Sequence, residues 1–393
     1  MNIYFYRYGS LCEPDLIEEF TCLGFSVEEE TIEMERKDLK PGECVKLVSP
    51  KLMEHDYRFV FSINFFPWLS DVCQITGIPY LSLIVDSPVL ELYSHSLEHD
   101  VNRIFLFDRA LYDEFSPRNP GHVFHLPLSA CTTRFDRVIS QASESERARY
   151  CSEISFIGST YQEKCPFNQL SLPEHWRGYA DGLIEAQLKV YGYNFLESIL
   201  SDDFVTAVQD NNPQIYHFPE GSIPAYKQMI AQQFLSVKVA EQERIRALKM
   251  LSEDLNVTIY TRSDLSELPR LHNRGFARSM TEMPLIFHES SINLNITAKS
   301  IRTGLPQRIF DVLGCRGFLI TNYQAELADY FELGKDLVAY GSLEELHDLC
   351  RYYLEHEEER MVIANNGYRK VQQLHNTRSR ILAMLDLAFP ANN

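Results

Sequence analysis

Residues 291–323 have the sequence SINLNITAKSIRTGLPQRIFDVLGCRGFLITNY, and this stretch decides the fold class. Apolar and polar residues alternate from Ile292 to Thr297, a period-2 pattern that predicts a β-strand. A polar loop follows, and Pro306 then opens a predicted helix. A second apolar run, Phe318 to Thr321, predicts another strand. A strand, a loop, a helix and a strand in this order indicate an α/β sheet.

The loop before the predicted helix is a candidate anion-binding site. A helix N-terminus presents unpaired backbone N–H groups and the positive end of the helix dipole, and both favour a diphosphate. Ser300, Arg302, Thr303 and Gly304 lie just ahead of this end. Loops of this kind occur in any α/β sheet, so a polar turn that meets only water is the alternative interpretation.

The helix itself carries three polar residues with helical spacing. Gln307 and Arg308 lie four and three residues before Asp311, so all three can project from one face while apolar residues pack elsewhere. A carboxylate one turn beyond a phosphate site is well placed to accept hydrogen bonds from ribose hydroxyls. We therefore expect Asp311 to hold a ribose beside the anion site.

Length and charge limit the function classes. The chain has 393 residues, enough for two domains with separate cores. Its formal net charge is −18, which argues against a nucleic-acid-binding protein and against a polybasic membrane-surface enzyme.

The cysteine pattern and the hydropathy indicate a cytoplasmic protein. The nine cysteines form no C-x-x-C pair, which favours free thiols in a reducing compartment and gives no zinc framework. No run of about 18 apolar residues is present, so we expect no signal peptide and no transmembrane anchor.

Predicted strands and helices alternate along residues 1–145, which indicates a doubly wound parallel sheet. The strongly apolar strand from Tyr80 to Val85 ends at Asp86. Ligands gather at the carboxyl ends of parallel strands, so Asp86 is a candidate general base. Because Asp-Ser-Pro is also a good helix N-cap sequence, a structural cap is the alternative.

A polar segment, residues 140–149, is the predicted linker to a second domain that spans residues 146–376. Its sheet is expected to begin with the strand from Glu153 to Ile157. Residues 166–251 show helical rather than strand patterns and predict a helical insertion. Acceptor recognition and subunit contact are both open roles for this insertion, and the oligomeric state is left open.

The opening stretch resembles the nucleotide-sugar-binding half of GT-B glycosyltransferases, and within them the CgeB-like (spore-maturation-type) group. That module typically runs INLN, a short loop, a G-x-P-x-R-[VI]-F-E helix, a glycine and an apolar strand that ends in Thr. The matching residues are Ile292 to Asn295, Gly304 to Asp311, Gly317 and Phe318 to Thr321. The segment from Glu153 to Ser159 is similar to the one that opens the second domain in this group.

The resemblance implies a GT-B fold of the α/β class, with two Rossmann-like domains that face each other across a cleft and a helical insertion in the second. Residues 1–145 would take the acceptor, residues 146–376 would bind the donor, and the last helix, about 377–393, would pack back on the first domain. The implied activity is transfer of a hexose or N-acetylhexosamine, from a UDP-sugar, to a protein or cell-surface glycan.

Several site residues follow from the resemblance. Asp311 stands where related retaining enzymes have the second Glu of a Glu-x7-Glu pattern, whereas the first Glu has no counterpart near Ser300 to Thr303. Retention versus inversion therefore stays open. The loop that contains Gly158 and Ser159 corresponds to a glycine loop that approaches the donor phosphates in wider GT-B families. The expected donor-binding residues are Gly158, Ser159, Lys164, Asn295, Ser300, Arg302, Thr303, Gly304, Gln307 and Asp311, and the expected catalytic residues are Asp86 and Arg308.

The expected chemistry requires no metal. Helix dipoles and the basic side chains of Lys164, Arg302 and Arg308 can neutralise a leaving diphosphate, and no Asp-x-Asp motif ends a strand. Ordinary surface salt bridges are the alternative role for each basic residue. For Asn295 the alternative, and the preferred interpretation, is that its side chain ties loops together. No cofactor is expected besides the UDP-sugar co-substrate. Two rival functions share the fold: a GT-B sugar-nucleotide epimerase, and a non-catalytic carbohydrate- or nucleotide-sugar-binding protein.

Overall fold

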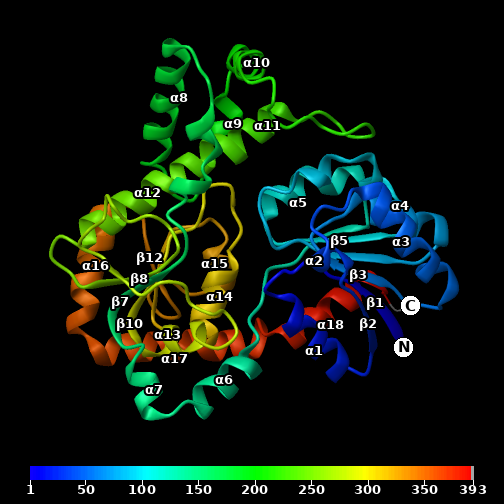
Figure 1. Ribbon diagram of the computed structural model, residues 1–393. Helices are drawn as coiled ribbons and strands as arrows, with labels where there is room; N and C mark the ends of the chain where they lie inside the picture. Colours follow the sequence, from blue (N-terminus) through cyan, green and yellow to red (C-terminus); the bar gives the residue numbers. More distant parts are fainter. Residues whose placement is uncertain (391–393) are drawn as a thin grey trace. The chain divides into compact units, whose positions relative to one another are not determined.

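The computed structural model describes residues 1–390 and divides the chain into two compact α/β units (Figure 1). The first unit comprises Met1–Leu128, Phe218–Ala225 and the C-terminal segment that begins at Thr377. The second unit comprises Ser129–His217 and Tyr226–Asn376. Each unit is built around its own six-stranded sheet.

The first sheet has the strand order β2-β1-β3-β4-β5-β6, and all its strands are parallel. The chain adds β2 on one side of β1 and then crosses to add β3 on the other side. The order therefore reverses between β1 and β3, which makes this pair the topological switch point of the sheet. The strands are β1 Asn2–Tyr6, β2 Ser26–Glu30, β3 Val60–Ile63, β4 Tyr80–Leu83, β5 Asn102–Leu106 and β6 Val123–His125.

Helices cover both faces of the first sheet, as a parallel sheet with two buried faces requires. Phe5, Phe20, Phe61 and Phe105 are fully buried, and each contributes about 1.5–3 kcal/mol by leaving water. The C-terminal helix α18 adds side chains such as Met384 to this core. The helices are α1 Glu13–Cys22, α2 Ile32–Glu35, α3 Pro41–Glu54, α4 Pro67–Thr76, α5 Arg109–Phe115 and α18 Thr377–Ala388.

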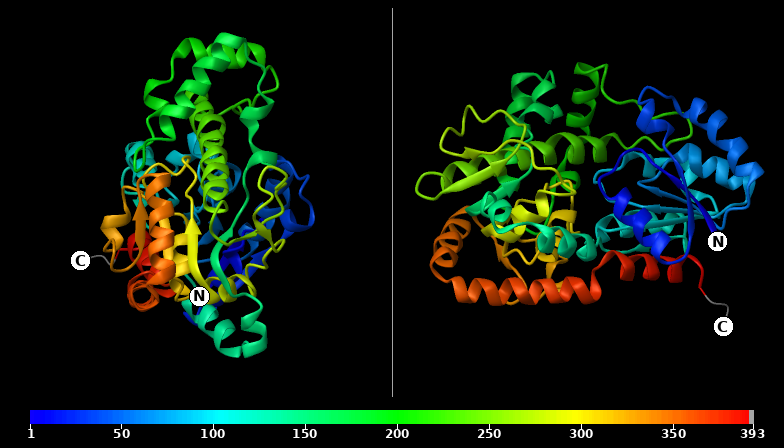
Figure 2. Two further views of the ribbon diagram at one scale, coloured as in Figure 1. Left: turned by 90° about the vertical axis from the view of Figure 1, so that its left-hand side faces the viewer. Right: turned by 60° about the horizontal axis from the view of Figure 1, so that its bottom comes forward.

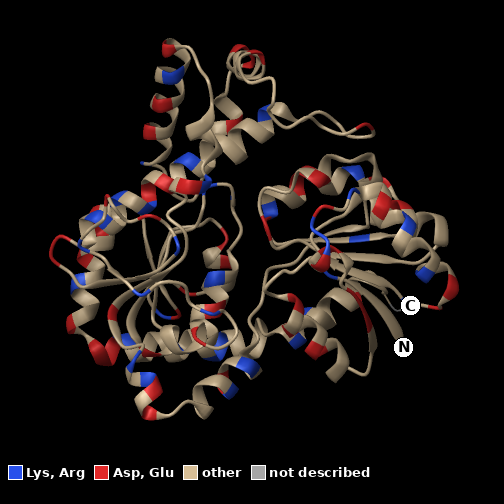
Figure 3. Cartoon of the chain, viewed as in Figure 1, with Lys and Arg blue, Asp and Glu red and all other residues tan. Residues whose placement is uncertain are grey.

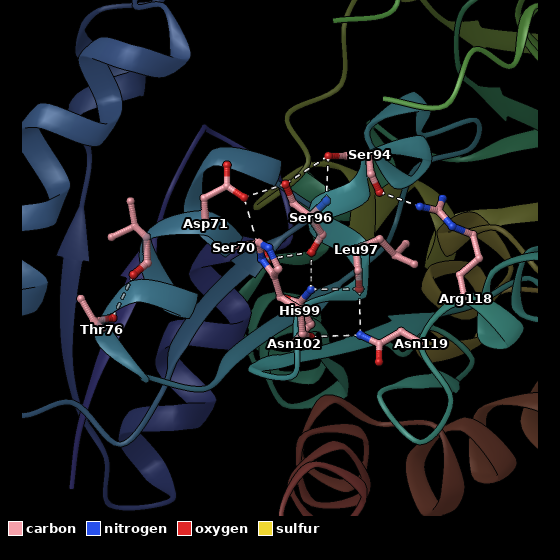
Figure 4. Close-up of polar contacts among 11 residues, drawn as sticks. Ser70, Asp71, Thr76, Ser94, Ser96, Leu97, His99, Asn102, Arg118 and Asn119 are labelled. Carbon is pink, nitrogen blue, oxygen red and sulfur yellow. Dashed lines mark hydrogen bonds and ion pairs between the residues drawn. The ribbon is translucent and has the colours of Figure 1, made fainter. Parts of the chain in front are cut away.

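A buried polar network fixes the loops around the start of β5 (Figure 4). Ser70 Oγ, from α4, donates to Asn102 Oδ1 at 2.7 Å and lies 3.1 Å from His99 Nδ1. Asp71 approaches the same ring nitrogen at 3.8 Å. In a hydrolytic triad the acid and the nucleophile use different ring nitrogens, and Ser70 is fully buried. This Ser, His and Asp group is therefore structural.

The second sheet has the order β12-β11-β10-β7-β8-β9 and is also parallel throughout. Its order reverses between β7 and β10, so the switch point lies between these two strands. The strands are β7 Ser152–Ile157, β8 Val257–Tyr260, β9 His272–Asn273, β10 Ser290–Asn295, β11 Leu319–Asn322 and β12 Val338–Tyr340.

Two helices precede the second sheet where the sequence predicted a linker. The polar segment 140–149 forms the end of α6 and all of α7, and both helices belong to the second unit. Ser143 Oγ accepts from the Glu146 N–H, a capping bond that starts α7. Outside residues 166–251, the helices of the second unit are α6 Thr132–Gln141, α7 Glu144–Ala148, α13 Met283–Glu289, α14 Gln307–Gly314, α15 Leu327–Tyr330, α16 Leu343–Glu355 and α17 Glu357–Leu374.

The region predicted as an insertion is helical, and α12 leads from it back to the second sheet (Figure 2). Trp176 and Tyr179 of α8 pack on Phe204 of α10, with ring centroids 5.6 and 5.3 Å apart. The segment Phe218–Ala225 leaves this layer and is part of the first unit. The elements are α8 Glu174–Gln187, α9 Leu196–Ile199, α10 Asp202–Asn211, α11 Tyr226–Met229, a π-helical turn Ile230–Leu235 and α12 Ser236–Leu251.

Charged side chains are interspersed over both units rather than gathered on one basic face (Figure 3). The chain has 55 acidic and 37 basic residues, so the excess is negative. No helix among residues 1–390 is both long and apolar enough to span a bilayer.

Gly367 tests how tightly α17 packs, and Gly182 of α8 provides the control. A Cβ atom on Gly367 would lie 2.4 Å from the Asp336 carbonyl oxygen and 2.7 Å from Leu313 Cδ2, whereas one on Gly182 of α8 would meet nothing within 4 Å. We predict that Gly367→Ala lowers stability by roughly 1–3 kcal/mol through overpacking. The control Gly182→Ala should raise stability by up to about 1 kcal/mol, because Ala favours a helix. Urea unfolding midpoints measure both, and equal midpoints for the two variants would contradict the packing.

Candidate active site

The switch point of the second sheet brings most of the predicted donor-binding residues together. β7 and β10 pair in parallel, with Phe156 opposite Leu294, so the loops that follow them leave the sheet side by side. Gly158, Ser159 and Lys164 follow β7, and Ser300 to Gly304 follow β10. Ligands bind beyond the carboxyl ends of strands at such a point.

Arg244 joins these two loops. Its Nη1 donates to the Ser159 carbonyl oxygen at 2.7 Å, and its Nη2 donates to the Ile296 carbonyl oxygen at 2.7 Å. The guanidinium also lies over the Tyr161 ring, 4.4 Å from the centroid. Sequence analysis did not identify Arg244, because its partners are 85 and 52 residues away and its helix carries no local motif.

The loop after β7 is tightly tied within itself. Tyr161 has φ of 68°, a left-handed conformation that is unusual for a bulky residue and is typical of functional loops. Its N–H donates to Ser159 Oγ at 2.8 Å, and Ser159 Oγ donates to Glu163 Oε1 at 3.1 Å. Lys164 is exposed, and its ammonium makes no ion pair or hydrogen bond with residues 1–390.

Arg308 lies in the first turn of α14 without an acidic ion-pair partner among the described residues. Its guanidinium packs over the Phe287 ring, 5.1 Å from the centroid, and against Met283 Sδ. Burial lowers the pKa of Arg308, while the charge of Asp311 opposes this shift. A guanidinium held against apolar groups is costly unless a counter-charge reaches it, so this position is suited to an anion.

Gln307 and Asp311 lie on one face of α14. Gln307 Nε2 donates to Asp311 Oδ1 at 2.9 Å and to the Ser129 carbonyl oxygen at 2.7 Å. Asp311 is 8% exposed, so its carboxylate is largely shielded from water. The hydrogen bond from Gln307 fixes the orientation of the carboxyl group relative to the helix.

The loop between β10 and α14 is held by two carboxylates from other elements. Thr303 Oγ1 donates to Glu326 Oε1 at 2.8 Å, and Arg302 Nη1 lies 3.6 Å from Glu197 Oε2 of α9. Ser300 and Gly304 are buried. Glu326 follows β11, and no local sequence pattern identifies it because its partner is 23 residues away.

Asn295, the last residue of β10, uses both amide hydrogens inside the protein. Its Nδ2 donates to Thr297 Oγ1 and to Thr321 Oγ1, each at 2.9 Å. These bonds tie β10 to β11 at their carboxyl ends. The side chain of Asn295 therefore shapes the edge from which the Ser300 to Gly304 loop departs.

A buried ion pair supports the start of this loop. Lys299 Nζ lies 3.4 Å from Glu243 Oε2 of α12, and the two side chains are 5% and 1% exposed. Burial raises the pKa of Glu243, while the charge of Lys299 opposes this shift. Lys299 also lies over the Tyr191 ring at 4.3 Å, and its carbonyl oxygen accepts from Asn194 Nδ2 at 2.6 Å. The insertion thus contacts the loop directly.

Asp86 follows the carboxyl end of β4 in the first unit and is exposed. It does not cap a helix, since the next helical turn, Leu90–Tyr93, has Val89 at its N-cap. Asp86 Oδ2 instead accepts from Asn64 Nδ2 at 2.6 Å and from the Tyr8 hydroxyl at 3.4 Å. Sequence analysis identified neither Asn64 nor Tyr8.

Metal-ligand clusters are not found among residues 1–390: no group of three or more His, Cys, Asp or Glu side chains converges there. Lys164, Arg302 and Arg308 are basic groups of the second unit that can meet negative charge.

Part of the second unit is similar in sequence to a known protein family. Residues 241–386, which include β10, α14 and the later part of α12, match a family model described as glycosyl transferase-like. No match was found among curated protein sequences. The match covers the switch-point loop and the whole of α14, where the polar face of Gln307, Arg308 and Asp311 lies.

Solved structures extend the likeness to the whole chain. The chain has the GT-B fold. A glycosyltransferase from Rickettsia africae aligns with a TM-score of 0.57 at 10% identity, over 99% of each chain. Sucrose-phosphate synthase from Thermosynechococcus elongatus gives 0.57 at 10% identity, over 98% of each. Anabaena HepE in complex with UDP and glucose gives 0.54 at 11% identity, over 98% of this chain and 99% of that one.

The Lys299 and Glu243 pair leads to a double-mutant prediction. Glu243→Gln leaves a buried ammonium without a counter-charge and should destabilise the protein by roughly 3–5 kcal/mol. Adding Lys299→Met should recover most of this loss, because two apolar or neutral groups replace the pair. Urea unfolding of Glu243→Gln, of Lys299→Met and of the double variant gives the coupling energy between the two side chains.

The matched control is the exposed pair of Lys335 and Glu332, whose side-chain nitrogen and oxygen are 2.8 Å apart. Lys335→Met should leave the unfolding midpoint nearly unchanged, since solvent screens an exposed pair. If Glu243→Gln had an equally small effect, the buried pair would not support the loop.

Proposed function

We propose that this protein is a glycosyltransferase, of the CgeB-like kind, that transfers a hexose or N-acetylhexosamine from a UDP-sugar to a glycan or protein acceptor. The second unit would bind the donor and the first unit would bind the acceptor. The family match at residues 241–386 and the shared fold support the reaction class. The nine cysteines, all within residues 1–390, form no disulfide, which is consistent with the cytoplasmic location that we propose.

The observation that carries the proposal is Arg308. A guanidinium packed on Phe287 in the first turn of α14, without an acidic ion-pair partner among the described residues, is suited to binding an anion. The α14 N-terminus adds the positive end of a helix dipole to the same region. Together they suit the diphosphate of a nucleotide sugar.

The neighbouring residues take roles that follow from their positions. Asp311, one turn further along α14, would accept hydrogen bonds from the ribose hydroxyls. Lys164 and Arg302 would add positive charge beside the phosphates, and Ser300, Thr303 and Gly304 would line the loop. Gly158 and Ser159 would let the backbone approach the donor, with Arg244 holding their loop against Ile296.

The reaction needs charge stabilisation and a proton acceptor. As the bond between the anomeric carbon and the phosphate oxygen breaks, negative charge develops on the diphosphate, and Arg308 with the α14 dipole would stabilise it. Asp86 of the first unit would accept the proton of the acceptor hydroxyl. Positive side chains and backbone N–H groups take the part that a metal ion plays in other transferases.

Nucleotide binding tests the function and the site together. UDP and UDP-glucose should raise the melting temperature of the wild-type protein, because a ligand that binds only the folded state stabilises it. Arg308→Met should weaken UDP binding roughly tenfold to a hundredfold, the expected loss for a hydrogen bond to a charged group. Arg308→Lys should recover part of the affinity.

Arg316→Met is the matched control, since Arg316 follows the other end of α14 and pairs with Asp136 at 3.3 Å. It should bind UDP like the wild type. Equal UDP affinity in Arg308→Met and the wild type would refute the site. Isomerisation of UDP-glucose without an acceptor would indicate an epimerase instead.

Metal dependence gives a separate prediction. Transfer or donor hydrolysis should persist after dialysis against EDTA, because Arg308, Arg302, Lys164 and the α14 dipole would neutralise the leaving group. Activity assayed with and without added Mg²⁺ or Mn²⁺ measures this. A requirement for either ion would contradict the proposed metal-independent mechanism.

A further inference from the structure

The carboxyl edge of the first sheet contains a polar cluster at its own switch point. Tyr8 follows β1, Asn64 follows β3, and the order of strands reverses between these two. Asp86 follows β4, the neighbour of β3. The three side chains come from parts of the sequence up to 78 residues apart and meet at the position where a doubly wound sheet binds ligands.

Asn64 is the centre of the cluster. Its φ of 57° is left-handed, a conformation that Asn tolerates better than most residues. Its Oδ1 accepts from the Val85 N–H at 3.1 Å, which anchors the amide to the end of β4. Its Nδ2 then donates to Asp86 Oδ2 at 2.6 Å and to the Tyr8 hydroxyl oxygen at 2.9 Å.

Tyr8 completes the arrangement from the other side. Its hydroxyl accepts from Asn64 and donates to Asp86 Oδ2 at 3.4 Å. Burial, followed by the negative charge of Asp86, raises the pKa of Tyr8, so the phenol keeps its proton at neutral pH. Both Asn64 and Tyr8 therefore act as donors to one oxygen of the same carboxylate.

The other oxygen of Asp86 is left for a ligand. Asp86 Oδ1 has no hydrogen-bond or ion-pair partner among residues 1–390, and the side chain is exposed. A carboxylate held through one oxygen, with the second one open to solvent, has the orientation that a general base requires. A helix cap or a simple surface acid would not need two dedicated donors.

The charges around this cluster disfavour an anionic ligand. Arg7, the cation that directly follows β1, is already engaged by Glu13 at 3.0 Å and by Glu29. Arg109, which follows β5, begins α5 two strands from β3. A phosphorylated or carboxylated ligand would meet the negative charge of Asp86 with little local compensation.

An aromatic surface adjoins the cluster. The Phe66 ring, which is half-buried, packs edge-on against the Tyr8 ring, with centroids 5.7 Å apart. Sugar rings present apolar C–H faces together with hydroxyl groups. An aromatic ring beside a carboxylate, an amide and a phenol offers matching apolar and hydrogen-bonding groups to such a molecule.

We propose that Asn64 and Tyr8 are positioning residues for Asp86, and that this edge takes an uncharged sugar as the acceptor. The inference rests on the proposed glycosyltransferase function and deepens it by naming the acceptor class. In the reaction, the acceptor O–H bond breaks and its proton passes to Asp86 Oδ1. The acceptor oxygen bonds to the anomeric carbon, and the bond from that carbon to the diphosphate oxygen breaks, with its electron pair leaving on UDP.

Three substitutions distinguish an effect on the orientation of Asp86 from an effect on folding. Asn64→Gly removes the amide but keeps the left-handed backbone, which glycine adopts without strain. Tyr8→Phe removes only the hydroxyl. The matched control is Tyr57→Phe, because the Tyr57 hydroxyl also donates to a carboxylate, that of Glu28, but lies before β3 at the opposite edge of the sheet.

The assay uses UDP-glucose as donor, with methyl β-D-glucoside and glucose 6-phosphate as alternative acceptors. We expect transfer to the uncharged glucoside in preference to the phosphate. Asn64→Gly should lower kcat roughly tenfold or more, as expected for a lost hydrogen bond to a charged group, and Tyr8→Phe should lower it less because its bond is longer. UDP affinity should stay at the wild-type level, and Tyr57→Phe should retain full activity.

Preference for glucose 6-phosphate, or wild-type kcat in both Asn64→Gly and Tyr8→Phe, would overturn the inference. If neither acceptor is used, saturation-transfer NMR with methyl β-D-glucoside decides: binding that weakens in Asn64→Gly supports the inference, and no binding or unchanged binding overturns it. Failure of the proposed function is distinguishable, because the wild-type protein would then show no thermal stabilisation by UDP or UDP-glucose.

Discussion

Parallel strand pairing is the constraint on which the rest of this structure depends. All strands of both sheets are parallel, so every connection must cross over the sheet, and every strand ends at the same edge. Each sheet also reverses its strand order once, between β1 and β3 in the first and between β7 and β10 in the second. The loops at these points diverge to opposite faces and leave room for a ligand. Both polar clusters described above lie at these two positions.

The two clusters differ in charge because arginine side chains build the one in the second unit, whereas a carboxylate is the centre of charge in the first. In the second unit, Arg244 donates to the Ser159 and Ile296 carbonyl oxygens, and Arg308 packs on Phe287, so positive charge accumulates where backbone N–H groups already favour an anion. In the first unit, Asn64 and Tyr8 donate to Asp86, so negative charge is fixed in orientation. One edge thus suits a diphosphate and the other suits a hydroxyl group that loses a proton. This division of charge agrees with the proposed transfer reaction.

Local sequence pattern predicted the elements that position the second cluster. Strand alternation identified β10, and the predicted helix after Pro306 is α14, with Gln307 and Asp311 on one face as their spacing indicated. The segment 140–149, predicted as a linker, is largely helical, because Ser143 supplies an N-cap that the apolar pattern does not reveal. The donor roles of these residues stay predictions.

The sequence by itself determined the alternation of strands and helices, the position of α14 and the candidates on its polar face, because these depend on periodicity and on neighbours a few residues apart. Only the tertiary structure decided that Arg244 joins two loops, that Glu326 and Glu243 hold the loop before α14, and that Asn64 and Tyr8 fix one oxygen of Asp86. The hydrogen bonds among these residues join positions that are 22 to 85 residues apart in the sequence, so no local pattern predicts them. The crossover connections of a parallel sheet bring such residues to one edge, and that arrangement exists only in the folded chain.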